Sequence, residues 1–158
     1  MIFGFIRRKA ATADAISAVR PLMALLKIRG PVPTEALHDP YVLGFLQIVV
    51  LFHVTSVVRG DRLDDFIGDA MQAVHKEIGG TNHLTISEAH IRYATDKHPD
   101  FMRGQGDADK VIGLMHGFAM DRSKQPLMLV NMTPNPEEAT WLIHERFVGR
   151  VNQIRDSL

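Results

Sequence analysis

The sequence lacks cysteine, a net charge and a second long apolar run. The absence of cysteine excludes disulfide bonds and thiolate chemistry, and it fits a reducing compartment, so we expect a cytoplasmic protein. The 18 Lys and Arg residues balance the 18 Asp and Glu residues, so the total charge does not draw the chain to nucleic acid or to anionic lipid. A chain of 158 residues that is 46% hydrophobic is long and apolar enough to bury one self-sufficient core.

The sequence also lacks the short motifs of common enzymes and cofactor sites. No two of its eight histidines are three or four residues apart, which excludes the H-E-x-x-H zinc motif. The segment 104–106 has two glycines but no third, and it follows no strand, so it is not a dinucleotide fingerprint. Neither a phosphate-binding loop nor a nucleophile elbow occurs. We therefore expect no metal and no cofactor, and the sequence favours a protein that is not an enzyme.

One apolar stretch, Tyr41 to Val58, dominates the pattern of the chain. A helix that is apolar around most of its circumference must be surrounded by other helices or by lipid. Its length is near the lower limit of roughly 17 to 25 residues for a membrane span. Gln47 and His53 interrupt the run, and the strongly polar segment 59–62 follows it, so we predict a buried core helix. The helix-turn-helix rhythm of 26–37 leads into this apolar helix instead of a polar recognition helix, so we expect no nucleic-acid partner.

Apolar residues at helical spacing predict further helices on both sides of this stretch. Thr34 is expected to cap a single turn at 34–38, and Thr85 to cap the helix that follows it. The run 126–132 has no partner strand, so we predict that it is not a strand. The fold class is thus an all-α, single-domain bundle of about six helices around residues 41–58, formed by residues 12–158. Besides the central helix, we expect a loop at 101–106 and helices at 12–28, 63–78, 85–97, 107–120 and 136–155.

Residues 1–11 form an apolar tip followed by a basic cluster. One interpretation is a terminus that is flexible or folded onto the core. The alternative is weak, reversible contact with a membrane surface, in which aromatic side chains enter the interface and basic side chains meet anionic headgroups. The residues that would make this contact are Phe3, Phe5, Arg7, Arg8 and Lys9.

Four histidines lie one on each of four long predicted helices: His53, His75, His116 and His144. A helical bundle can bring such positions together around a metal, and whether these four converge in space is left open. They are also the acid–base candidates if the protein is an enzyme. Three of them sit at the edges of apolar stripes, where a ring can pack and still reach water. His53 alone is expected to point inward, and it is the candidate ligand-binding residue.

Two functions fit this pattern. The first is a non-enzymatic interaction module that binds a protein partner or a second copy of itself as a homodimer, because apolar helix faces and eight methionines suit adaptable contact surfaces. The alternative is a binder of a small apolar ligand or cofactor, with a cavity beside the central helix and His53 at its polar end.

Overall fold

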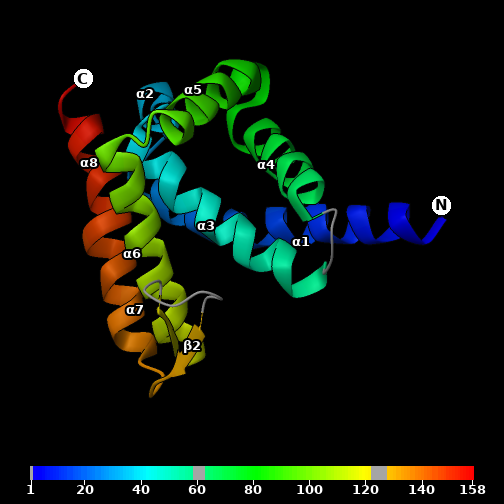
Figure 1. Cartoon of the computed structure of the whole chain (residues 1–158). Coiled ribbons are helices and arrows are strands. Elements are labelled where there is room, and N and C mark those ends of the chain that lie inside the picture. The colour runs from blue at the N-terminus through cyan, green and yellow to red at the C-terminus, as the bar shows by residue number, and fades with distance from the viewer. Residues whose placement is uncertain (1, 59–62, 122–127) are drawn as a thin grey trace.

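The computed structural model describes residues 2–58, 63–121 and 128–158, with side chains for 8–58, 63–118 and 130–158. It confirms the all-α bundle arranged around a central apolar helix. In Figure 1, α3 crosses the middle of the molecule, α4 and α5 form an arch on one side, and α6, α7 and α8 lie on the other. The elements are α1 (Ile2–Leu26), η1 (Lys27–Arg29), α2 (Thr34–Leu37), α3 (Pro40–Val57), α4 (Leu63–Gly79), η2 (Gly80–Asn82), α5 (His83–Thr95), α6 (Pro99–His116), β1 (Phe118–Asp121), β2 (Met128–Asn131), α7 (Pro136–Leu142), η3 (Ile143–Val148) and α8 (Gly149–Asp156).

The central helix α3 begins where the sequence predicts. Asp39 accepts hydrogen bonds from the backbone N–H groups of Tyr41 and Val42, and Pro40 occupies the first helical position, where a missing N–H costs little. This is the one described helix that is long and apolar enough to cross a membrane, with a mean hydropathy of 1.7 over 18 residues. Other parts of the chain bury 56% of those residues, as around the core helix of a bundle.

Two glycines allow α3 and α6 to cross in direct backbone contact. A Cβ atom on Gly44 would lie 2.1 Å from the carbonyl oxygen of Phe101, and a Cβ atom on Gly104 would lie 2.1 Å from that of Tyr41. The loop predicted at 101–106 is therefore wrong, because this segment is the second turn of α6. Its glycines serve helix packing, and Phe101 is buried in the core.

The first helix is longer than predicted. α1 begins at Ile2, ten residues before the expected start, and continues through Pro21. In Figure 1 its N-terminal turns extend beyond the other helices. Arg8 forms an ion pair with Asp69 of α4, which attaches this end of α1 to the bundle. Of the proposed membrane-contact residues, Phe3, Phe5 and Arg7 lie outside the described side chains, while Arg8 and Lys9 are exposed.

The helices α4 and α5 form a hairpin through the short turn η2. α4 ends at Gly79, close to the predicted end. The predicted capping role of Thr85 is wrong, because α5 already begins at His83 after Asn82. Thr85 instead donates a hydrogen bond from its hydroxyl to the Asn82 carbonyl oxygen and contacts His38 at 2.9 Å. Thr34 is likewise the first residue of α2 and not its cap, which is Pro33.

A short antiparallel hairpin follows α6 and corrects two predictions. Gly117 ends the helix with φ at 76°, a left-handed conformation that favours glycine. The chain then forms β1, which pairs Phe118 with Asn131 and Ala119 with Val130 of β2. The helix predicted to reach residue 120 thus stops at His116, and the segment predicted not to be a strand contains β2. The sequence prediction missed the partner strand because it had assigned those residues to the helix.

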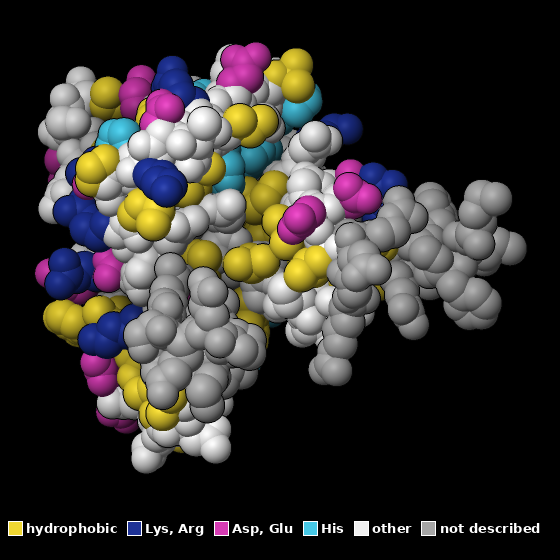
Figure 2. Space-filling view, viewed as in Figure 1, with side chains coloured by type: hydrophobic (Ala, Val, Ile, Leu, Met, Phe, Trp, Pro, Cys, Tyr) yellow, Lys and Arg dark blue, Asp and Glu magenta, His cyan; other side chains and the backbone are white. Residues whose placement is uncertain are grey.

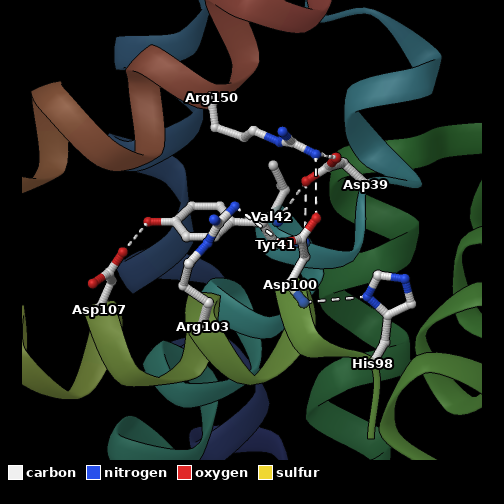
Figure 3. Close-up of polar contacts among 8 residues, drawn as sticks. All are labelled: Asp39, Tyr41, Val42, His98, Asp100, Arg103, Asp107 and Arg150. Atoms are coloured by element: carbon white, nitrogen blue, oxygen red, sulfur yellow. Dashed lines mark hydrogen bonds and ion pairs between the residues drawn. The ribbon is translucent and has the colours of Figure 1, made fainter. Parts of the chain in front are cut away.

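The C-terminal helical stretch packs along α6 and holds the beginning of α3. It consists of α7, the π-helical turn η3 and α8, and Asn135 caps its start by accepting a hydrogen bond from the Glu138 N–H. Arg150 binds the buried Asp39 through Nη2 at 2.7 Å and Nε at 3.1 Å, as Figure 3 shows. One carboxylate therefore caps α3 and joins it to α8.

Candidate functional site

A pocket of about 360 Å³ opens between α4 and α5, with α3 at its inner side. Figure 2 shows histidine side chains in the hollow between these two helices, with hydrophobic side chains along its edges. The volume lies within the range of small-molecule sites, roughly 300 to 1,000 Å³. The lining residues are Gln47, Asp64, Ile67, Gly68, Met71, Gln72, His75, Ser87, His90, Ile91, Ala94 and Thr95.

Two histidines form the inner wall of this pocket. His75 of α4 is 3% exposed and His90 of α5 is 6% exposed, and their ring centroids lie 5.1 Å apart. The His90 ring also meets the edge of Phe101 of α6, with a centroid distance of 5.3 Å. Buried histidine rings in contact with one another are unusual, because imidazole is a polar group that needs hydrogen bonds.

Hydrogen bonding of this pair is incomplete. His75 Nδ1 lies 2.7 Å from the Ser87 hydroxyl oxygen, but its Nε2 has no partner among the residues with described side chains. His90 makes no hydrogen bond to any described residue, and its Nδ1 is completely shielded from solvent. A buried polar group without a partner costs about 1–3 kcal/mol, so both rings have unused hydrogen-bonding capacity beside a cavity.

Both rings are neutral at physiological pH. Burial, together with the smaller effects of the neighbouring His90 and His83, lowers the pKa of His75 to about 4. Burial alone lowers the pKa of His90 to about 4. At neutral pH each imidazole therefore offers one N–H donor and one acceptor nitrogen.

The rest of the lining is mostly apolar, with polar groups at defined places. Ile67, Met71 and Ile91 supply hydrocarbon surface, while Gln47 is held on α3 by a 2.5 Å hydrogen bond from Gln105. Asp64 is the one formally charged side chain that the described part of the chain contributes to the lining, and no described Lys or Arg takes part. The pocket therefore suits an apolar molecule and disfavours an anion.

The hydrogen bond between Ser87 and His75 resembles the contact of an activated serine, but its surroundings do not support catalysis. A general base works best with a pKa near the operating pH, and the pKa of His75 is about 4. No described carboxylate contacts the Nε2 atom, whereas a third group normally orients the base of a catalytic triad. We therefore assign this contact to holding the His75 ring in place.

The histidines singled out in the sequence do not gather at this pocket. His53 is not the fully inward residue expected, since its side chain is 32% exposed and its Nδ1 lies 3.3 Å from a carboxylate oxygen of Asp14. His116 packs against Phe52 and His144 is exposed. His75 is more deeply buried than its predicted place at a stripe edge. Among the described residues, no three His, Cys, Asp or Glu side chains are grouped as metal ligands.

His90 was missed as a site residue, although the sequence contains a signal for it. Within the predicted helix 85–97, His90 lies four residues after Ile86 and three residues before Tyr93, so it falls on the same helix face as these two. A histidine in the middle of an apolar stripe is a candidate for burial. Its pairing with His75 depends on how α4 packs on α5, which the pattern of one helix does not contain.

A second pocket, of about 210 Å³, is polar and lies beside the start of α3. The Tyr41 hydroxyl donates a 2.8 Å hydrogen bond to Asp107, and the Arg103 guanidinium stacks 5.4 Å from the centre of the Tyr41 ring, as Figure 3 shows. Burial, followed by the contact with Asp107, raises the pKa of Tyr41. Arg103 also pairs with Asp100 at 3.1 Å, so this network joins α3 to α6 and its polar groups are largely satisfied.

The chain matches no protein-family model, no curated protein and no solved structure, so its site is interpreted from geometry alone.

Proposed function

We propose that this protein binds a small, mainly apolar molecule in the pocket between α4 and α5. The observation that carries the proposal is the pair of buried, neutral histidines, His75 and His90, which line an apolar cavity and whose hydrogen bonding to the described residues is incomplete. A site of this kind combines hydrocarbon surface for affinity with a few polar groups for orientation. The cavity lies beside the central helix α3. His75 and His90 line it, whereas His53 is not among its lining residues.

The arrangement of elements supports a binding role. The hairpin of α4 and α5 contacts the core through α1 and α3, while its inner surface remains open around the pocket. In a bundle, the space between helices is a usual place for a ligand. Filling this pocket with the ligand would bury the apolar faces of Ile67, Met71 and Ile91 more completely.

A neutral fluorescent probe, N-phenyl-1-naphthylamine, tests this proposal. We expect its fluorescence to rise on binding to the wild-type protein and the binding to be lost in Gly68→Trp. Gly68 lines the pocket, and a Cβ atom added there meets no atom within 4 Å, so a tryptophan can start from this position without displacing the backbone and place its indole in the cavity.

The matched control is Gly106→Trp. Gly106 is also an exposed helical glycine with open space around it, but it lies on α6 outside the pocket. The proposal predicts that this variant binds the probe like the wild type. Equal loss in both variants, or equal binding in both, contradicts the assignment to this pocket.

A second candidate is self-association or binding of a protein partner. It is favoured by exposed apolar side chains where α6 meets the β1–β2 hairpin. These are Met115, Val130 and Met132, which are 49%, 50% and 39% exposed. Exposed apolar patches of this kind often mark protein contacts. Light scattering after size-exclusion chromatography tests it with the Met115→Glu and Met132→Glu variants. A dimer that dissociates in these variants supports the candidate, and a monomeric wild type contradicts homodimerisation.

A further inference from the structure

We infer that the ligand of the α4–α5 pocket is an uncharged apolar alcohol or phenol whose hydroxyl group pairs with His90. This inference rests on the proposed function and identifies the chemical class of the ligand.

The first argument is the access to His90. His90 is 6% exposed and lines the pocket, its Nδ1 is completely shielded, and neither ring nitrogen has a described partner. Nε2 is thus the nitrogen that a molecule in the pocket can reach. On the other ring, His75 Nδ1 is already used by Ser87 and Nε2 is shielded. Of the two buried rings, His90 is therefore the one that offers a free nitrogen, Nε2, to a polar group at the inner end of a ligand.

The second argument is charge. Among the residues that the structure describes, the lining contains Asp64 and no Lys or Arg, and the two histidines are neutral because their burial disfavours the protonated form. A carboxylate or phosphate in this cavity would lose its hydration without gaining a positive partner. The pocket therefore selects against anions and accepts uncharged molecules.

The third argument is the chemistry of the neutral imidazole. Depending on the tautomer, His90 Nε2 either donates or accepts a hydrogen bond. A hydroxyl group both donates and accepts, so it pairs with either tautomer, whereas an ether or a ketone pairs with one. The remaining lining offers apolar surface from Ile67, Met71, Ile91 and Ala94 to the body of the ligand.

Calorimetric titration with three compounds of the same shape tests this inference: 2-naphthol, 2-methylnaphthalene and 2-naphthoate. Without a partner, a buried hydroxyl binds more weakly than a methyl group, because it loses its hydration. With His90 as partner, we expect 2-naphthol to bind about 3- to 10-fold more tightly than 2-methylnaphthalene, the range given by one hydrogen bond. We expect 2-naphthoate to bind more weakly than both.

The His90→Phe variant should reverse this order, because it keeps an aromatic ring but removes the nitrogen. Binding of 2-methylnaphthalene should stay within about twofold of the wild type, as expected when the apolar contacts remain. His90→Gln retains a donor and an acceptor and should keep part of the preference for 2-naphthol. His144→Phe, at an exposed position on η3, should leave all three affinities unchanged.

The outcomes separate this inference from the proposed function. Equal or tighter binding of 2-methylnaphthalene to the wild type overturns the hydroxyl assignment, while the apolar pocket stands. Tightest binding of 2-naphthoate overturns the exclusion of anions. Binding of none of the three, together with failure of N-phenyl-1-naphthylamine, overturns both proposals. The comparison among ligands uses wild-type protein, so it holds even if His90→Phe does not fold.

Discussion

The imidazole rings of His75 and His90 lie 5.1 Å apart in the interior, one from each arm of the α4–α5 hairpin. Packing two apolar residues there would fill the same space without unpaired nitrogens. The pair therefore costs stability in the free protein, and such a cost is typical of a site arranged for a partner molecule.

Acidification should destabilise the protein through this pair. Both folded-state pKa values are about 4, below the ordinary 6.5, so the unfolded chain binds more protons between these values. The stabilisation is complete above about pH 6.5 and is lost as the pH falls toward 4. We expect the free energy of unfolding to be about 3 kcal/mol lower near pH 5.5 than near pH 7.5 from the two groups together.

Urea denaturation at the two pH values, by circular dichroism, measures this effect. The comparison is with the double variant His75→Gln, His90→Gln, which does not titrate at these positions. The difference in unfolding free energy between the two pH values should shrink in the double variant. The same difference in both proteins would show that other groups cause the pH dependence.

Removing the buried carboxylate of Asp39 should be strongly destabilising. Asp39 is 7% exposed, caps α3 and accepts two hydrogen bonds from Arg150. Asp39→Ala therefore leaves two backbone N–H groups without their cap and the Arg150 guanidinium with its 3.7 Å contact to Asp100 alone among the described carboxylates. We expect a loss of about 3–5 kcal/mol in the free energy of unfolding. The control is Asp156→Ala, which breaks an exposed pair with Arg29 and should cost less than about 1 kcal/mol. Similar losses in both variants would contradict the role of Asp39.

Alanine at the glycines of the α3–α6 crossing should separate the two helices. Gly44→Ala and Gly104→Ala place a methyl group against a backbone oxygen, which no side-chain movement relieves, so we expect each to cost at least about 1–3 kcal/mol. At Gly68 and Gly106 the added atom meets nothing within 4 Å, and alanine should stabilise the helix by up to about 1 kcal/mol. Thermal unfolding of the four variants checks this contrast, and equal shifts in all four would refute the close crossing.

The architecture could be predicted where a residue's neighbours along the chain determine its role. The apolar run 41–58 and the amphipathic helix 63–78 gave the core helix and α4 almost within a residue. The helical conformation of the segment 101–106 could not be predicted in this way. Its glycines suggest a loop when only the local sequence is considered, whereas in the fold they lie in a helix that packs closely on α3. β1 and β2 depend on pairing between two segments that are separated along the chain, which local spacing does not describe.

The candidate site was predicted only in its general form. A cavity beside the central helix was expected, but His53 proved to be partly exposed beside Asp14. On a helix that is apolar nearly all round, the pattern does not define which side faces the deepest part of the core. The site instead combines one residue from α4 and one from α5, and that combination follows from the packing of the hairpin.

Methyl NMR during titration with N-phenyl-1-naphthylamine tests the binding site most directly. Aromatic ring currents shift nearby methyl signals, so we predict changes at the pocket residues Ile67, Met71 and Ile91, with Ile28 and Met132 unchanged as exposed controls elsewhere. Changes confined to Met132 and its neighbours, or no changes at the pocket methyl groups at a saturating probe concentration, would contradict a ligand site between α4 and α5.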